Sequence, residues 1–205
     1  MTIRLPRGDL PDLSHYQTGA VAIDTETMGL DPHRDRLCVV QLSPGDGSAD
    51  LVQIPAGKAV APNLAKLLAD TRILKLFHFG RFDMGVLYNT LGVMPAPVYC
   101  TKIASRLART YTDKHGLKDL VRELLGVDLS KQQQLSDWGS PDLSEAQVTY
   151  AASDVLHLHA LKAKLDVMLA REGREKLAEA CFRFLPDRVL LDLAGWPSED
   201  IFAHS

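Results

Sequence analysis

Two acidic residues end an apolar stretch near the N-terminus. Residues 20–27 read Ala-Val-Ala-Ile-Asp-Thr-Glu-Thr, which is typical of a buried strand that closes on Asp24 and Glu26. Because side chains alternate between the faces of a strand, the two carboxylates point the same way. Paired carboxylates repel each other unless cations lie between them, and hard divalent ions such as Mg²⁺ and Mn²⁺ take oxygen ligands. The pair predicts half of a metal site, with a strand end that carries two solvated acids as the alternative.

A third acid and a tyrosine–aspartate pair occur later in the chain. Asp83 follows the strand-like run 72–78 at the point where a helical spacing begins, so it can reach a metal held by a neighbouring strand. Tyr150 and Asp154 are four residues apart in an amphipathic segment from about 144 to 172, and therefore share one helical face. Taken alone, Asp83 is explained as an acid at a helix N-terminus. The other two are explained as a buried phenol and a surface acid.

Together these stretches resemble the DEDD superfamily of 3′-to-5′ exonucleases, in the branch whose third motif contains tyrosine. The motifs are Asp24-x-Glu26, Asp83 and Tyr150-x-x-x-Asp154. The run from Asp137 to Ser144, which reads Asp-Trp-Gly-Ser-Pro-Asp-Leu-Ser, is similar to ribonuclease D and its relatives, and the resemblance covers nearly the whole chain. Within this family, residues 25–47 and 195–205 are most similar to the nano-RNase C enzymes of diribonucleotide degradation.

The resemblance implies an α/β, ribonuclease-H-like fold, in which a mixed β-sheet is flanked by helices and followed by a helical C-terminal part. Hydrophobic patterns predict strands near residues 21–24, 37–42, 50–54, 73–77 and 97–100, with a hairpin turn at 43–47. From about residue 102 onward the pattern is nearly all helical, and Pro186 is expected to bend or restart the last helix. We expect one exonuclease domain over residues 1–205, without the additional helical domains of full-length ribonuclease D.

The implied cofactors are two divalent cations, Mg²⁺ or Mn²⁺. Two cations about 4 Å apart stabilise the attacking water and the leaving 3′ oxygen of a phosphodiester when carboxylates fix their separation. The resemblance assigns this role to four acids, and the motif-three phenol to positioning of the nucleophilic water. A phenol with an ordinary pKa near 10 suits that orienting role better than the role of free base. The residues are Asp24, Glu26, Asp83 and Asp154 for the metals and Tyr150 for the water.

Substrate contacts follow from the resemblance and from side-chain chemistry. The backbone at Thr25 should meet the terminal 3′-hydroxyl, and Leu30, with Met28 as second choice, should wedge between the last two bases. Phe79 or Phe82 offers a stacking face, although each is equally plausible as a core residue. The candidates for holding a 5′ phosphate, left unranked, are Lys102, Arg106, Arg109, Tyr111, Lys114 and His115. The solvated face of a helix pair is the alternative explanation for these basic residues.

Composition and charge narrow the functional classes. The chain has 205 residues, of which 46% are hydrophobic and 24% charged, so it is expected to fold around a sizeable core. Because 23 Lys and Arg face 26 Asp and Glu, the long basic groove of a protein that tracks nucleic acid is not implied. The local basic cluster between residues 101 and 122 suits one or two phosphates instead. Neither a signal peptide nor a membrane span is visible, which predicts a cytoplasmic protein, and the three cysteines predict buried free thiols.

The sequence therefore predicts a metal-dependent 3′-to-5′ exoribonuclease that hydrolyses short RNA, above all dinucleotides such as pGpG, to nucleoside 5′-monophosphates. The alternatives are a ribonuclease D-like trimmer of longer RNA, a DNA exonuclease, a non-catalytic nucleic-acid-binding module and a structural oligomerisation protein. The resemblance also implies a ring-shaped homo-octamer. An apolar tail at about residues 186–205, which includes Trp196, Ile201 and Phe202, is expected to pack on a neighbouring subunit.

Overall fold

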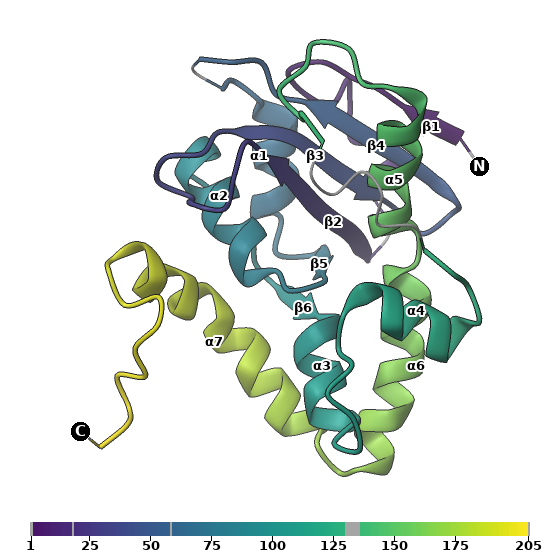
Figure 1. Cartoon of the computed structure of the whole chain (residues 1–205), viewed down its shortest axis with the longest axis vertical. Coiled ribbons are helices and arrows are strands. Elements are labelled where there is room, and N and C mark those ends of the chain that lie inside the picture. Colours follow the sequence, from purple (N-terminus) through teal and green to yellow (C-terminus); the bar gives the residue numbers. More distant parts are fainter. Residues whose placement is uncertain (1, 18, 58, 130–135, 205) are drawn as a thin grey trace.

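A mixed β-sheet forms the centre of the molecule. The computed structural model describes residues 2–17, 19–57, 59–129 and 136–204. Within these residues a six-stranded sheet has the order β1-β4-β3-β2-β5-β6, with helices packed around it (Figure 1). The strands are β1 (Thr2–Arg4), β2 (Ala20–Thr27), β3 (Leu37–Ser43), β4 (Ser48–Gln53), β5 (Leu74–Phe77) and β6 (Val98–Cys100). The expected α/β, ribonuclease-H-like class is confirmed.

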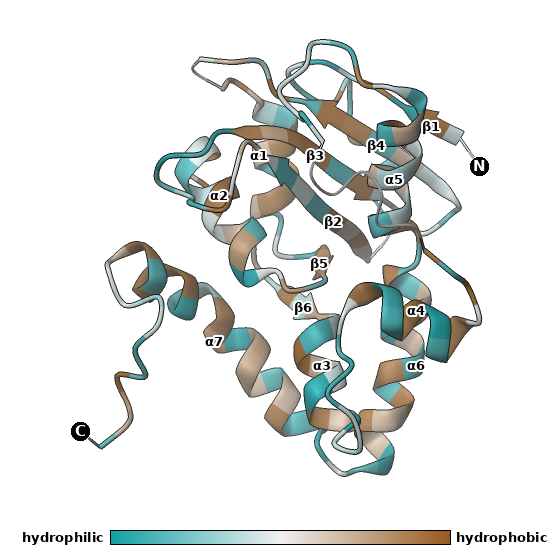
Figure 2. Cartoon of the chain, viewed as in Figure 1, coloured by the Kyte–Doolittle hydropathy of each residue, from teal (hydrophilic) through white to brown (hydrophobic). Residues whose placement is uncertain are grey.

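Strand β2 occupies the middle of the sheet. It pairs with β3 in antiparallel and with β5 in parallel register, and Asp24 lies opposite Gln41 of β3. The β3–β4 pair is the predicted hairpin, and β6 extends the parallel side. Because the middle of a sheet is covered on both faces, Val21, Ala22 and Ile23 of β2 and all of β3 are buried. Figure 2 shows β2 carrying a hydrophilic stretch among mostly apolar strands, which marks the position of the acidic pair.

Helices cover the sheet and continue beyond it. Two of them carry predicted site residues: α2 follows β5, and α5 packs across β2, β3 and β4. The helices are α1 (Pro62–Ala69), α2 (Arg81–Leu91), α3 (Thr101–Ala108), α4 (Leu117–Leu125), α5 (Glu145–Leu156), α6 (Leu158–Arg171) and α7 (Glu175–Leu193), with a 3-10 turn η1 (Ser14–Tyr16). Among the described residues, no helix is long and apolar enough to cross a membrane.

Two helical predictions need correction. The segment expected as one helix from about 144 to 172 is two helices, because the chain turns at His157 between α5 and α6. The expected capping at Ser144 is present as a reciprocal pair of hydrogen bonds with Gln147. Of the two outcomes expected at Pro186, a restart of the last helix is wrong, because α7 runs through it from 175 to 193. Packing of α7 against α2, β6 and α3 compensates for the backbone hydrogen bond that proline cannot donate.

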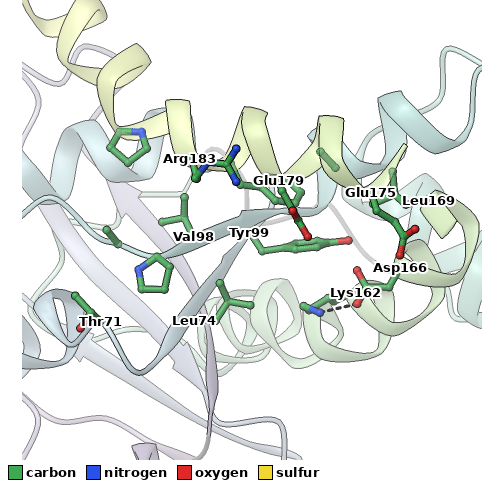
Figure 3. A pocket seen from close by; sticks show the side chains of 15 residues that line it. Thr71, Leu74, Val98, Tyr99, Lys162, Asp166, Leu169, Glu175, Glu179 and Arg183 are labelled. Atoms are coloured by element: carbon green, nitrogen blue, oxygen red, sulfur yellow. Dashed lines mark hydrogen bonds and ion pairs between the residues drawn. The ribbon is translucent and has the colours of Figure 1, made fainter. Parts of the chain in front are cut away.

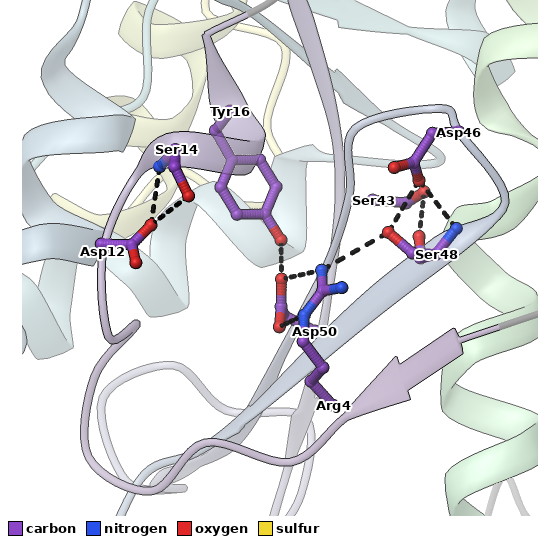
Figure 4. Close-up of polar contacts among 8 residues, drawn as sticks. All are labelled: Arg4, Asp12, Ser14, Tyr16, Ser43, Asp46, Ser48 and Asp50. Atoms are coloured by element: carbon purple, nitrogen blue, oxygen red, sulfur yellow. Dashed lines mark hydrogen bonds and ion pairs between the residues drawn. The ribbon is translucent and has the colours of Figure 1, made fainter.

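Strand β1 was not predicted, and a buried polar network explains it (Figure 4). The guanidinium of Arg4 donates to both oxygens of Asp50 on β4, at 2.6 and 2.7 Å. The buried hydroxyl of Tyr16 donates to the same carboxylate. Three residues with little apolar character thus become a strand because a long-range ion pair holds them beside β4. The cysteines are free as predicted, with Cys38 and Cys100 buried and Cys181 half-buried.

Candidate active site

Three of the predicted acids meet on one face of the sheet. Asp24 and Glu26 project from β2 toward α5, which carries Asp154. One carboxylate oxygen from each residue can be chosen so that all three lie within 4.8 Å of one another. The three groups are half-buried, so their charges are only partly screened by water. Side chains from residues 130 positions apart therefore form one compact anionic cluster.

Burial and mutual repulsion favour the protonated forms of these acids. Burial, then the neighbouring Asp83, Asp154 and Glu26 raise the pKa of Asp24 well above its ordinary range. Burial, followed by Asp154 and Asp83, raises the pKa of Glu26 to about 9. The pKa of Asp154 rises to about 7, again chiefly through burial, while a hydrogen bond from Tyr150 opposes the rise. A cluster that resists ionisation in this way is one that a bound cation would stabilise.

Asp83 occupies the first turn of α2, as predicted, and is buried. The hydroxyl of Thr25 on β2 donates to its Oδ1 atom at 2.6 Å. Burial raises the pKa of Asp83 to about 7, and the Thr25 hydrogen bond is the main effect in the opposite direction. Asp83 is not one of the three acids within 4.8 Å, although its charge raises the pKa of both acids on β2. Thr25 thus has a side-chain role that the sequence did not indicate.

Tyr150 lies one helical turn from Asp154 on α5 and is half-buried. Its ring is 6.0 Å, centroid to centroid, from the ring of the buried Trp138. Burial, then the charges of Asp154, Glu26 and Asp24, raise the pKa of the phenol above its ordinary value of 10. The hydroxyl therefore stays protonated near neutral pH and can donate a hydrogen bond beside the carboxylates, which agrees with the orienting role expected for it.

Residues that the sequence did not single out hold the loops around the cluster. Arg36 donates to the carbonyl of Gly139 at 3.2 Å, which fixes the loop before α5 against the loop after β2. A Cβ atom at Gly139 would lie 2.6 Å from the sulfur of Met28 and 2.9 Å from Nη2 of Arg36, so a larger residue there would displace the ends of these two side chains. Gln41 lies behind the acids, with its amide nitrogen 3.5 Å from Glu26. Gln41 could have been noticed in the sequence, because it is an amide in an otherwise apolar strand. Nothing in the sequence marks Arg36 as a residue that holds these loops.

Three of the four predicted base-contacting residues, Leu30, Phe79 and Phe82, line a cavity of about 590 Å³ next to α2, whereas Met28 is exposed outside its lining. Leu30 is 85% exposed and Phe79 48% exposed, whereas Phe82 packs partly on the core. Phe79 has a φ angle of 63°, which is unusual for a residue with a side chain, and Lys102 lies 4.1 Å above its ring. Such a conformation directs an aromatic face outward at the strand-to-helix turn, and functional sites are where this strain is commonly found.

The predicted basic cluster contains two kinds of residue, those held by internal hydrogen bonds and those without an ion pair to any described residue. Arg109 is fully buried, and its guanidinium donates to Ser105, to the carbonyl of Lys114 and to Glu123. Tyr111 donates to the same glutamate at 2.8 Å. His115 bonds to Ser105 at 2.9 Å, and burial followed by nearby arginines lowers the pKa of its ring. These three side chains shape the loop between α3 and α4. Among the residues that the structure describes, Lys102, Arg106 and Lys114 form no ion pair.

Comparison with known proteins agrees with this geometry. Residues 12–170 match the 3′-5′ exonuclease family. The chain belongs to that family. The exonuclease is 64% identical to NrnC of Brucella melitensis in a structure with bound Mg²⁺, with full coverage of both chains and a TM-score of 0.96. A structure of the same Brucella protein bound to pGG gives 65% identity and a TM-score of 0.97, again with full coverage.

Ribonuclease D proteins are more distant relatives of the exonuclease. Ribonuclease D of Gluconacetobacter diazotrophicus is 37% identical over 154 residues, which is 75% of this chain and 39% of that protein. The crystal structure of Escherichia coli RNase D matches with 30% identity and a TM-score of 0.76, over 86% of this chain and 46% of the other. The chain thus spans about two fifths of the length of these curated relatives. The expected resemblance to ribonuclease D and nano-RNase C is confirmed.

The acidic cluster fits the divalent cations that the family implies. Its donors are all carboxylate oxygens, which hard cations prefer, and a cation would offset both the burial and the mutual repulsion that raise the pKa of each acid. A cavity larger than the one next to α2 lies elsewhere in the described part of the exonuclease. It has a volume of about 800 Å³ between β6, α6 and α7, with Tyr99, Lys162 and Phe182 in its wall (Figure 3). It contains none of the predicted site residues, so size alone does not locate the active site.

Proposed function

We propose that this exonuclease is a metal-dependent 3′-to-5′ exoribonuclease of short RNA, which hydrolyses dinucleotides such as pGpG to nucleoside 5′-monophosphates. The observation that carries the proposal is the cluster of Asp24, Glu26 and Asp154, with Asp83 and Tyr150 beside it. The choice of a dinucleotide rests on the similarity along the full chain to Brucella NrnC, one structure of which contains pGG. Ribonuclease activity also agrees with the similarity to ribonuclease D.

In this proposal the acids hold two divalent cations, Mg²⁺ or Mn²⁺. When bound, the cations supply Lewis-acid stabilisation of the charge that develops on the phosphodiester oxygens. Asp24, Glu26 and Asp154 are the ligands, and Asp83 joins them from α2. The Thr25 hydroxyl keeps the carboxylate of Asp83 oriented through the 2.6 Å hydrogen bond. Because the strand and both helices are packed into the core, the ligand positions are fixed before substrate binds.

Tyr150 orients the attacking water. Its raised pKa keeps the proton on the phenol. The hydroxyl therefore orients the water by a hydrogen bond and adds no negative charge to the site. We assign the base contacts to Leu30 and Phe79, which are both exposed and line the cavity next to α2. Base stacking on an aromatic ring is worth about 1 to 3 kcal/mol, which is a large share of the binding energy of a dinucleotide. Phe82 lines the same cavity and supports these contacts, whereas Met28 lies beside Gly139.

The 5′ phosphate is assigned to Lys102, Arg106 and Lys114. Lys102 lies over the ring of Phe79. A phosphate held by Lys102 would therefore be next to the ring assigned to a base. Arg106 and Lys114 are exposed, and neither is paired with a described acid. Arg109, Tyr111 and His115 act behind them, since their hydrogen bonds hold the loop between α3 and α4 in shape. A few cations at one end of the site suit a single phosphate better than a long strand.

A length series tests the function. RNAs of two to seven nucleotides with a 5′ label are incubated with the exonuclease in Mg²⁺ or Mn²⁺, and the products are followed with time. The Asp24→Asn variant, which keeps the shape of the side chain, is the control. Rapid consumption of the dinucleotide with slow loss of the longer RNAs supports the proposal. Equal rates at all lengths contradict the dinucleotide preference, and absence of metal-dependent cleavage contradicts the enzymatic assignment.

Trimming of longer RNA is the second candidate function, and the 37% identity to ribonuclease D favours it. The same length series distinguishes the two, because a trimmer shortens the heptamer stepwise. Parallel DNA oligonucleotides test the sugar preference, since the cluster of acids does not report a 2′-hydroxyl.

We propose further that the protein acts as a homo-octamer, as the resemblance to nano-RNase C implies. Trp196, Ile201 and Phe202 are exposed near the C-terminus, where they offer apolar surface to a second subunit. Light scattering coupled to size exclusion measures the assembly, and a monomeric mass would contradict the proposal.

A further inference from the structure

The cavity that contains Leu30 and Phe79 is closed on one side by the C-terminal part of the chain. One wall comes from the loop after β2, a second from the start of α2, and a third from the end of α7 and the residues that follow it. The third wall consists of Val189, Asp192, Leu193, Gly195 and Pro197. Figure 1 shows the end of α7 on the α2 side of the molecule. A segment far from the catalytic motifs in sequence thus borders the predicted base-binding region.

An ion pair fastens this third wall to the start of α2. Arg81, the first residue of α2, donates through Nε and Nη2 to the two carboxylate oxygens of Asp192 on α7, the latter bond being 2.5 Å long. The same Nη2 atom also donates to the carbonyl of Pro197 at 2.5 Å. The side chains are 32% and 18% exposed, so solvent screens this pair less than a surface ion pair. One guanidinium therefore holds both α7 and the segment after it.

A second arginine and close packing reinforce the attachment. Arg188 lies 3.1 Å from Asp192 and donates to the carbonyls of Trp196 and Pro197 at 2.9 and 3.3 Å. The turn between α7 and these carbonyls passes through Gly195, whose φ of 113° disfavours a larger residue. A Cβ atom at Gly85 on α2 would lie 3.6 Å from Val189 of α7, which shows how closely the two helices pack. The wall is therefore held at several points.

We propose that Arg81 is a positioning residue, and that its pair with Asp192 holds residues 192–197 as one wall of a cavity that receives a nucleobase of the substrate. Arg81 is two residues from Asp83, so the attachment also places the wall in a fixed relation to the catalytic helix. This inference rests on the proposed function, because it assumes an oligonucleotide substrate.

The wall should matter most for the shortest substrate. A dinucleotide has two bases and few phosphates with which to bind, so each base contact is a large fraction of its affinity. A heptanucleotide has further nucleotides that can contact the surface outside the cavity. Loss of the wall should therefore weaken binding of the dinucleotide more than that of the heptamer. It should leave the chemical step unchanged, because neither Arg81 nor Asp192 belongs to the acidic cluster.

The test compares Arg81→Gln, Asp192→Asn and the double variant with the wild-type exonuclease in Mg²⁺ or Mn²⁺. We expect each single variant to raise KM for the dinucleotide about tenfold, with kcat within about twofold and KM for the heptamer within about threefold. The double variant should raise KM by less than the product of the two single effects, since both substitutions remove the Arg81–Asp192 pair and each also removes one contact of its own, to Pro197 or to Arg188. Arg72→Gln is the matched control, because Arg72 makes a similar two-pronged pair with Asp70 outside the cavity.

Several results would overturn the inference. If Asp192→Asn leaves KM unchanged while Arg81→Gln raises it, Arg81 contacts substrate directly and does not act through the wall. A fall in kcat without a change in KM, or equal losses for both lengths, also contradicts it. Arg81→Lys retains the charge but not the two-pronged geometry, and should raise KM by an intermediate amount if Arg81→Gln fails to fold. If the wild-type protein cleaves only longer RNA, the proposed function fails, and the wall is then judged by KM for the shortest RNA that is cleaved.

Discussion

Replacing Glu26 with glutamine should stabilise the metal-free protein while abolishing catalysis. Burial and the neighbouring Asp154 and Asp83 raise the pKa of Glu26 to about 9, from an ordinary value of 4.5. At pH 7.5 the unfolded chain ionises this group and the folded chain keeps its proton. Holding a proton about three pH units above the ordinary pKa costs up to about 4 kcal/mol. Because the acids share this cost and Glu26 is partly exposed, we expect Glu26→Gln to recover about half, roughly 2 kcal/mol.

Thermal unfolding in EDTA measures this gain. For a chain of this size, about 2 kcal/mol corresponds to a rise in Tm of about 4 to 8 °C. The sign of the pH dependence is fixed as well. The folded protein binds more protons than the unfolded chain between pH 4.5 and 9, so its stability should fall as pH rises through that interval. The fall should be shallower in Glu26→Gln, and saturating Mg²⁺ should raise the Tm of the wild type more than that of the variant.

Glu179→Gln is the matched control, since Glu179 is exposed on α7 and lies outside the acidic cluster. It should leave both the Tm and its pH dependence unchanged. A Glu26→Gln protein that unfolds at or below the wild-type temperature in EDTA at pH 7.5 would refute the reasoning. It would show that burial and mutual repulsion of the acids do not destabilise the metal-free fold.

Three further substitutions test individual contacts. Tyr150→Phe should lower kcat by about 10²-fold with a metal affinity within about twofold of wild type by calorimetry, because the phenol orients water and is not a ligand; an unchanged kcat would contradict this. Thr25→Val removes the hydroxyl that donates to Asp83, so the affinity for Mg²⁺ should fall about tenfold in the same titration. An unaltered affinity would show that Thr25 does not orient Asp83 for metal binding. Lys102→Gln should raise KM, and the slope of log KM against log salt concentration should fall by about one. A slope equal to that of the wild type would show that Lys102 does not contact the phosphate.

The sequence predicted the presence of the elements that carry the acids, although not the end of α5, because each lies in a segment with a strong hydrophobic pattern. The apolar run before Asp24 predicted β2, and the strand-to-helix change before Asp83 predicted the first turn of α2. Contacts between distant segments have no comparable local signal. The Arg4–Asp50 pair that creates β1 and the Arg81–Asp192 pair join residues 46 and 111 positions apart.

The basic cluster shows a second limit of sequence reasoning. Arg109, Tyr111 and Lys114 carry equally plausible chemistry for a phosphate, but only the fold shows that Glu123 approaches Arg109 and Tyr111 and occupies their donors. The sequence does not show which basic residues are buried. In the fold Arg109 is fully buried and Lys114 is exposed. The roles of the exposed members remain predictions.

The distribution of the acids along the chain affects when the nuclease can become active during synthesis. Asp24 and Glu26 are made early, whereas Asp154 lies on α5, in the last third of the chain. Because domains fold as units while the chain emerges from the ribosome, the cluster cannot close until α5 is free to pack on β2. Before that point a nascent chain lacks Asp154 beside Asp24 and Glu26, so the proposed metal site is incomplete.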